Sequence, residues 1–364
     1  MAETEFRKTD HIRICVEEDV QAHGNKTGFD EVMLVHNALP EIALEDVDTS
    51  LTLFNHRLDA PIIIDSITGG TDEAAKINSR LAEAAETLGL AMAVGSQRVA
   101  LENPKVVSTF QIVRKKAPHA FLMGNLGAPQ LVKGYDSKDI KKAAEMIDAD
   151  AFIIHLNPLQ EAIQPEGNTS YKGVLERIKD IASNLKIPLL VKETGAGIAS
   201  HEALLLEKAG VKGIDVSGAG GTSWAAVEYY RSKKSMDVVH AKLGEDFWDW
   251  GIPTVASIVE VSKSTSLTVI ASGGVRTGID VAKSISLGAE AAGLAQPLLK
   301  PALDGKVKES LQILIEEVKT AMFLVGADSI KALKSSPLII TGRTAEWLKA
   351  RGFKPEEYAR RTIR

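Results

Sequence analysis

The 364-residue sequence predicts an α/β protein, a TIM (β/α)8 barrel with an N-terminal extension and C-terminal helices. Eight short apolar segments each run into small or polar residues, most of them start roughly 23 to 36 residues after the one before, and helical periodicity fills the intervals. The segments start at Pro61, Leu90, Phe121, Phe152, Pro188, Gly213, Thr268 and Ala291. Because the strands of such a barrel end on one face, where substrates bind, the residues after these segments should form an active site.

The segments read, in order, PIIIDSITGG, LAMAVGSQR, FLMGNLG, FIIHLNP, PLLVKETG, GIDVSGAGG, TVIASGGV and AAGLAQP. Most open with a continuous apolar run, which is typical of parallel strands covered on both faces. The interval 77–89 shows the other pattern, because Ile77, Leu81, Ala84 and Leu88 recur at steps of three and four residues. Strand and helix patterns therefore alternate along the chain.

The barrel should occupy residues 59–300, with residues 1–58 as an extension and lid and residues 301–364 as a helical segment. One interval is long and leaves an insertion at 224–267. The aromatic residues of this insertion could cap a pocket, form a subunit interface or pack between helices. They are Tyr229, Tyr230, Phe247, Trp248 and Trp250.

Composition excludes several classes of protein. Hydrophobic residues make up 45% and charged residues 25%, without an apolar stretch long enough to cross a membrane, and the N-terminal residues lack an apolar export segment, so we expect a cytoplasmic protein. The single cysteine, Cys15, excludes an intrachain disulfide and a CxxC zinc site. A formal net charge of −5 argues against a nucleic-acid surface.

The ends of the seventh and eighth segments predict a phosphate site. Ser272-Gly273-Gly274-Val275-Arg276 follows one segment, and Ala295 and Gln296 follow the other. Glycines let backbone amides approach an anion closely, and barrels often hold a phosphate between these two loops. The alternative is a tight turn with a solvated arginine.

The other segment ends favour a flat cofactor that forms many hydrogen bonds, such as a flavin. They supply hydroxyls, an amide and one cation, and no His, Asp or Cys cluster has metal-ligand spacing. The residues are Thr68, Gly69, Gly70, Ser96, Asn125, Lys192, Ser217 and Thr222. Lys192 could stabilise the negative charge of a reduced flavin, or it could be a surface lysine or a partner of Glu193.

Longer motifs carry a family resemblance. They are RKTDHI at 7–12, SITGGT at 66–71, GSQR at 95–98, GNLG at 124–127, HLNPLQE at 155–161, VKETG at 191–195, VSGAGGTSWA at 216–225, SGGVRTG at 272–278 and AQP at 295–297. Together they resemble type II isopentenyl-diphosphate isomerases, from residue 7 to about residue 300. HLNPLQE and VSGAGGTSW are the most specific.

The resemblance implies an FMN-dependent enzyme that interconverts isopentenyl and dimethylallyl diphosphate, with Mg²⁺, and with NADPH or NADH to reduce the flavin. It implies FMN contacts at Thr68, Gly69, Gly70, Ser96, Asn125, Lys192, Ser217, Thr222, Gly274, Val275, Arg276, Ala295 and Gln296. It implies substrate contacts at Arg7, Lys8, Ser96, Gln97, Arg98, His155, Asn157 and Gln160, and magnesium at Glu161. Reduced FMN itself would move the proton, with Gln160, Lys192 and His155 as the catalytic side chains.

A diphosphate needs cations, and the chain offers Arg7, Lys8, His11, Arg98 and His155. The first three precede the barrel, so they can reach its mouth only if the extension folds over it as a lid. Without the resemblance, a solvated terminus would be the simpler interpretation.

Three other functions share parts of this pattern. FMN-dependent 2-hydroxy acid oxidases need a histidine base after the sixth strand, where this chain has Ser217, Gly218, Ala219 and Gly220. Inosine monophosphate dehydrogenases need a cysteine there, and Cys15 lies elsewhere. A non-catalytic flavin- or phosphate-binding barrel would not need so many varied polar strand ends. We expect an enzyme for small molecules that forms a homo-oligomer, a tetramer or an octamer.

Overall fold

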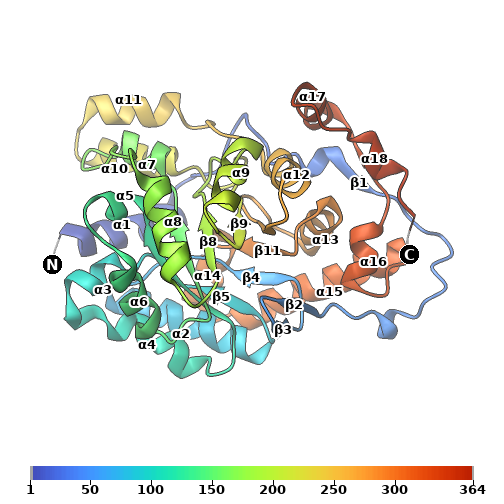
Figure 1. Ribbon diagram of the computed structural model, residues 1–364, viewed down its shortest axis with the longest axis horizontal. Coiled ribbons are helices and arrows are strands. Elements are labelled where there is room, and N and C mark those ends of the chain that lie inside the picture. Colours follow the sequence, from blue (N-terminus) through green and yellow to red (C-terminus); the bar gives the residue numbers. More distant parts are fainter. Residues whose placement is uncertain (1–2, 363–364) are drawn as a thin grey trace.

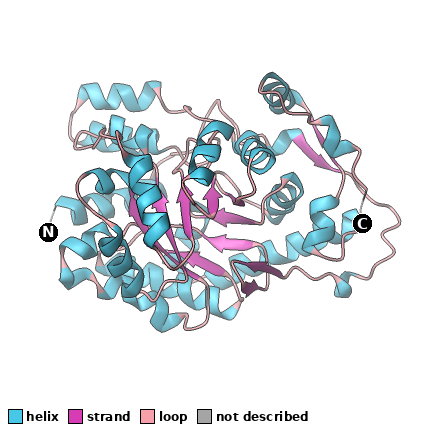
Figure 2. Ribbon diagram, in the orientation of Figure 1, coloured by secondary structure: helices cyan, strands magenta, loops and turns pink. Residues whose placement is uncertain are grey.

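A computed structural model describes the backbone of residues 3–362 and the side chains from residue 8 to residue 362. Its centre is a closed barrel of eight parallel strands, with helices around it (Figure 2). The strands are β4 (Ile62–Ile64), β5 (Ala91–Ala93), β6 (Leu122–Gly127), β7 (Ala151–His155), β8 (Leu189–Lys192), β9 (Gly213–Asp215), β10 (Thr268–Ala271) and β11 (Ala291–Leu294). Seven of them lie within predicted segments and β7 begins one residue before its segment, so the barrel prediction is confirmed.

Alternate residues of the strands pack into two separate cores. Ile62 and Ile64 face the helices and join the large core between the strands and the helix layer, whereas Ile63 points into the barrel. The barrel interior also contains Ala91, Ala93, Met123, Ile153, Leu190 and Ile270. A strand buried on both faces in this way has no polar face, which explains the continuous apolar runs.

Helices cover the outside of the barrel. The covering helices are α2 (Asp72–Thr87), α4 (Ser108–Lys116), α6 (Ser137–Met146), α8 (Val174–Asn184), α9 (Ser200–Lys208), α12 (Thr254–Ser264), α13 (Gly278–Leu287) and α15 (Val307–Val325). Shorter helices in the strand-to-helix loops are α3 (Arg98–Glu102), α5 (Ala128–Val132), α7 (Pro158–Ile163) and α14 (Gln296–Asp304). In α2, the Thr71 side chain accepts a hydrogen bond from the Ala74 amide and caps the helix, and Ile77 and Leu81 are buried, as their spacing predicts.

The N-terminal and C-terminal segments are joined. The first contains α1 (Glu3–Glu17), β1 (Val32–Leu34), β2 (Leu51–Leu53) and β3 (His56–Leu58), and the second contains α16 (Ile330–Ser335), β12 (Leu338–Ile340), α17 (Gly342–Ala350) and α18 (Glu356–Ala359). Strand β1 pairs antiparallel with β12, beside α18 and away from the N-terminus (Figure 1). The predicted C-terminal helices are present, together with this strand.

The insertion at 224–267 forms α10 (Trp224–Lys234), α11 (Val238–Asp246) and the covering helix α12. Tyr229, Tyr230 and Trp248 pack against one another with ring centroids 5.2 to 6.0 Å apart, and His23 stacks on Trp248 at 4.7 Å. These three aromatic residues therefore pack where α10 meets the turn that follows α11. Among residues 3–362, no helix has the length and apolar character needed to span a bilayer.

The β2–β3 hairpin closes the end of the barrel where the strands begin. Leu53 and Leu58 are 1% exposed and belong to the interior core, and Phe54 stacks on Phe121, just before β6, at 6.2 Å. The hairpin thus seals the end opposite to the strand tips.

We predict that Leu58→Ala will lower the free energy of unfolding by about 2–5 kcal/mol, because it leaves a cavity in a close-packed interior. Chemical denaturation measures this loss. Leu39→Ala is the control, since Leu39 is 73% exposed and its truncation should change stability by less than about 0.5 kcal/mol. Equal effects of the two substitutions would show that the hairpin does not seal the barrel.

Candidate active site

One pocket, a cavity of about 260 Å³, opens where the barrel strands end. It is lined by residues at or just after seven of the eight strands, and Ser217 and Thr222 complete it from the loop after β9. The residues at these ends are Asp65, Ser66, Ile67, Thr68, Gly95, Ser96, Asn125, His155, Lys192, Ser272, Gly273, Leu294 and Ala295. The strand tips thus converge on one site, as the barrel predicts.

The structure brings most of the predicted site residues together. Those that line the pocket are Lys8, His11, Thr68, Ser96, Arg98, Asn125, His155, Asn157, Gln160, Glu161, Lys192, Ser217, Thr222, Gly274, Val275, Arg276, Ala295 and Gln296. Gly69, Gly70 and Gln97 do not line it. Arg7 lies in α1, and its side chain is outside the part of the chain that the structure describes.

Gln97 and Gly69 support the site from behind. The Gln97 side chain is fully buried; its Nε2 donates to the Ala143 carbonyl at 2.7 Å, and its Oε1 accepts from the Asn125 amide at 3.0 Å. A Cβ atom on Gly69 would lie 2.2 Å from the Phe110 ring, so a larger residue would not fit there. The two residues fix the ends of β4 and β6 instead of lining the cavity.

Helix α1 lies across the mouth of the barrel. Lys8 Nζ donates to the carbonyls of Gly69 at 2.7 Å and Ser96 at 3.0 Å, just after β4 and β5. Lys8, His11, Ile12 and Cys15 all line the pocket. The extension therefore brings Lys8 and His11 to the site.

Glu228 on α10 connects this lid with the barrel. The carboxylate is fully buried and accepts hydrogen bonds from His11 Nε2 at 3.1 Å and Gln160 Nε2 at 3.2 Å, and it pairs with Arg231. Burial alone would raise the pKa of Glu228, but the hydrogen bond and charge of His11, with Arg231 and Gln160, hold it at about 2. Sequence reasoning missed this residue, a charged side chain that follows the apolar residues Trp224–Val227 of α10.

His155 is a neutral hydrogen-bonding group. Its Nδ1 lies 2.8 Å from Asn125 Oδ1, an atom that only accepts, so Nδ1 carries the proton and Nε2 keeps its lone pair. Burial, and then the charges of Lys192, Arg98 and Lys8, lower the pKa of His155 to about 3. A bound anion would reverse the effect of these neighbouring charges and favour a protonated ring.

Lys192 is a buried cation on the pocket wall, not a surface lysine. The residue is 4% exposed, and Nζ donates to the Glu193 carbonyl at 2.8 Å and lies 3.4 Å from Asp65 Oδ2 and 3.8 Å from Asp215 Oδ2. Burial pushes the pKa of Lys192 down, but the two carboxylates outweigh it and the pKa lies above its ordinary value. Sequence reasoning missed Asp65 and Asp215, although each adjoins a strand end.

The loop after β10 has the backbone that the phosphate prediction requires. Gly273 and Gly274 have φ angles of +95° and +74°, and a Cβ on Gly273 would lie 2.2 Å from the Gly218 carbonyl oxygen. The Arg276 side chain donates to Gln21 Oε1 at 2.8 Å and to the Val275 carbonyl at 3.0 Å. Helix α14 begins at Gln296, and residues of this loop and of the start of α14 both line the cavity.

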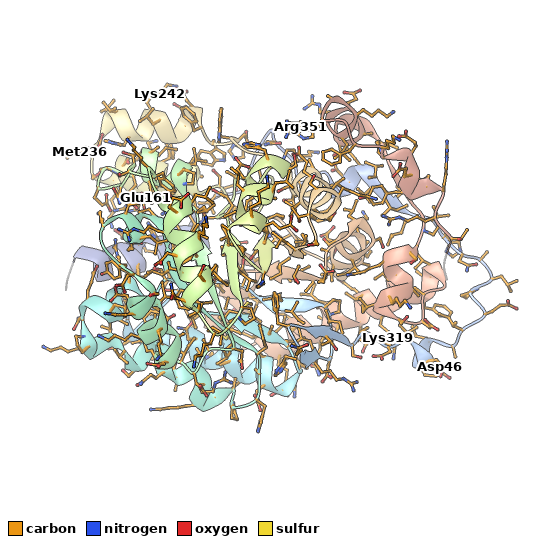
Figure 3. All side chains as sticks on the ribbon, viewed as in Figure 1. Asp46, Glu161, Met236, Lys242, Lys319 and Arg351 are labelled. Carbon is orange, nitrogen blue, oxygen red and sulfur yellow. The ribbon has the colours of Figure 1, made fainter. Side chains whose placement is uncertain are left out.

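Glu161, labelled in Figure 3, is a carboxylate on α7 that lines the pocket. Its Oε1 accepts from Asn157 Nδ2 at 3.1 Å, and its Oε2 accepts from the Asn168 amide at 2.5 Å. The part of the chain that the structure describes holds no cluster of three or more His, Cys, Asp or Glu residues that could hold a metal ion. Glu161 is thus a single carboxylate on the pocket wall, held in place by two hydrogen-bond donors.

Comparisons with known proteins agree with this geometry. The model of the FMN-dependent dehydrogenase family matches residues 161–340. Isopentenyl-diphosphate delta-isomerases are similar along nearly the whole chain: that of Methanosarcina acetivorans is 50% identical over 98% of this chain and 97% of its own. The enzyme of Methanothermobacter thermautotrophicus is 50% identical over 98% of this chain and 99% of its own. The enzyme of Pyrococcus furiosus is 46% identical over 96% of this chain and 90% of its own.

Solved structures share the fold at low sequence identity. A flavocytochrome b2 variant with sulfite bound aligns with a TM-score of 0.67 and 18% identity, over 94% of this chain and 84% of that one. A mandelate oxidase variant aligns with a TM-score of 0.63 and 19% identity, over 93% of this chain and 99% of that one. At this identity the likeness concerns the architecture alone.

Proposed function

The chain belongs to the isopentenyl-diphosphate delta-isomerases, in their FMN-dependent type, and from this premise we propose that it interconverts isopentenyl and dimethylallyl diphosphate on a reduced FMN. The observation that carries the proposal is the pocket itself. It has a buried lysine on its wall, a glycine-rich loop on one side and cationic side chains of α1 at its mouth.

The donor set of the pocket fits FMN. Gly274, Arg276 and the start of α14 suit its phosphate, while Thr68, Asn125 and Ser217 offer hydrogen bonds to a flat ring. When bound, the cofactor would supply the acid and base for the double-bond shift from its central ring. Lys192 would hold negative charge on the reduced ring by its own positive charge.

The mouth of the pocket suits the diphosphate. Lys8, His11 and Arg98 supply positive charge, and His155 can take up a proton and donate from Nε2 once the anion lies beside it. Gln160 offers an amide donor, Asn157 holds Gln160 and Glu161 in place, and Glu161 would share a magnesium ion with the phosphate oxygens. By covering the mouth, α1 would keep water from the reacting carbons.

Apolar side chains of the same pocket suit the prenyl chain. These side chains are Ile12, Ile67, Val99, Trp224, Leu294 and Leu299. A cation-like state of the substrate would then lie between an apolar wall and the negatively charged ring. We further propose NADPH or NADH as the reductant, a cytoplasmic location and a homo-oligomeric state, tetramer or octamer.

The purified protein should be yellow, should bleach with NADPH, NADH or dithionite, and should convert isopentenyl diphosphate only after bleaching. Proton NMR of the product distinguishes the two prenyl diphosphates. The second candidate, an oxidoreductase of the 2-hydroxy acid oxidase type, predicts instead that a 2-hydroxy acid bleaches the flavin. Conversion by the oxidised protein would contradict our proposal.

We predict that Arg276→Gln will weaken FMN binding by roughly tenfold to a hundredfold, because a charge-assisted phosphate contact contributes about 1.5–3 kcal/mol. Recovery of flavin fluorescence on dilution measures the affinity. Riboflavin, which lacks the phosphate, is the matched ligand and should bind both proteins alike. An equal loss for both flavins would place Arg276 away from the phosphate.

A further inference from the structure

Lys192 lies between two buried carboxylates at the side of the pocket. Asp65 follows β4, Asp215 ends β9, and Lys192 ends β8, where it is the register partner of Asp215. The three side chains are 3 to 6% exposed. With both carboxylates ionised, this cluster carries two negative charges and one positive charge.

The two carboxylates differ in their access to the pocket. Asp65 lines the cavity, and its Oδ1 accepts from the Ser66 amide at 2.6 Å. Asp215 does not line the cavity, whereas its partners Lys192 and Ser272 do. Asp215 Oδ1 accepts from the Ser272 hydroxyl and from the Ser217 amide at 3.3 Å.

A negative charge placed over Lys192 would upset this balance. The positive charge of the Lys192 ammonium would then also balance the new negative charge. The repulsion between the two buried carboxylates would be less well compensated. Buried groups in that position neutralise by binding a proton. Asp215 is the better proton acceptor of the two, because it has no direct access to water in the pocket and its Ser272 hydroxyl can turn to accept a hydrogen bond from a neutral carboxyl.

We propose that Asp215 is a positioning residue for Lys192 that takes up one proton from solvent when the flavin ring is reduced to its anion. This inference rests on the proposed function. The ring takes two electrons and one proton, which makes it an anion, and Asp215 takes a second proton. Two protons thus balance two electrons, and the total charge of the site does not change.

The electrostatics of the cluster agree with this role. Burial, and then the charge of Asp65, raise the pKa of Asp215 to about 7, against the opposing effects of Lys192 and the hydrogen bonds from Ser272 and Ser217. One more negative charge nearby would raise this pKa further. The groups outside the cluster that face it are Glu193, His155 and Ser272.

The pH dependence of the FMN midpoint potential tests the proposal, because its slope counts the protons that accompany the two electrons. At pH 8, where Asp215 is mostly ionised before reduction, we expect two protons. At pH 6, where it already holds its proton, we expect one. A slope of one proton from pH 6 to pH 9 in the wild-type protein would overturn the inference.

Asp215→Asn should lose the second proton at pH 8 and keep FMN bound. Glu193→Gln is the matched control: Glu193 is another buried carboxylate whose burial raises its pKa to about 7, although three backbone amides oppose this. The Glu193→Gln variant should keep the wild-type slope of midpoint potential against pH. A second proton retained in Asp215→Asn or lost in Glu193→Gln would overturn the assignment to Asp215.

Asp65→Asn covers the case in which Asp215→Asn does not fold. Lys192 would then pair with Asp215 alone and keep it ionised, so the second proton should again be lost. A wild-type protein that binds no FMN would overturn the proposed function and this inference with it. A protein that binds FMN but shows a one-proton slope at pH 8 would overturn this inference and leave the proposed function standing.

Discussion

Lys192→Met should lower turnover of isopentenyl diphosphate by roughly a hundredfold to a thousandfold while FMN remains bound. The expected loss is that of a buried charge aimed at negative charge in the transition state, which is commonly worth 10²–10³ in kcat. The measurement is kcat with fully reduced enzyme, after the flavin content of the variant has been determined. A variant that turns over normally with bound, reduced FMN would exclude this role of Lys192.

The same substitution should also cost stability, because it leaves Asp65 and Asp215 buried without their cation. Breaking a buried pair in this way typically costs about 3–5 kcal/mol. Lys192→Met/Asp215→Asn is the control, since it removes one of the two orphaned charges. It should recover part of the free energy of unfolding and none of the turnover, which separates the structural effect from the chemical one.

Glu228→Gln should produce the second large effect, a fall in kcat of up to about a hundredfold. Glu228 holds His11 on the lid and Gln160 at the fourth strand end, and small misplacements of site residues cost that much. Gln160→Ala should also lower turnover. If Glu228 acts through Gln160, the double variant should be little worse than Gln160→Ala, whereas effects that multiply would show independent roles.

Glu228→Gln should also weaken the fold in a pH-dependent way. The pKa of Glu228 is lowered from 4.5 to about 2, so its stabilising contribution is complete above pH 4.5 and is lost as the pH falls toward 2. The stability difference between wild type and variant should therefore shrink over that range in acid titrations. Glu166→Gln is the control, because Glu166 is a partly exposed partner of the same Arg231 and should cost less than about 1 kcal/mol.

The barrel could be predicted from the sequence because each strand has a local residue pattern of its own. In PIIID and PLLVK the first four residues are apolar and a polar residue ends the run, so strand number and order need no knowledge of distant contacts. The positions of site residues at the strand ends follow from that order. The Lys192 partners Asp65 and Asp215 were readable in the same way, since they stand where each apolar run stops.

Other features depend on tertiary structure. A residue in the loop after a strand can point into the pocket or into the wall behind it. Gln97 points into the wall, whereas its neighbours Ser96 and Arg98 line the pocket. Glu228 belongs to the site only because α10 packs beside α1 and α7. No local pattern of residues near position 228 encodes that packing.

The pairing of β1 with β12 sets an order of events during protein synthesis. Val32 and Ile340 are register partners, so β1 leaves the ribosome about 300 residues before its partner exists. At about 5–20 residues per second, this wait lasts roughly 15–60 s. During that time the edge of β1 is unpaired and open to association with other nascent chains, and this exposure ends only when β12 has been synthesised.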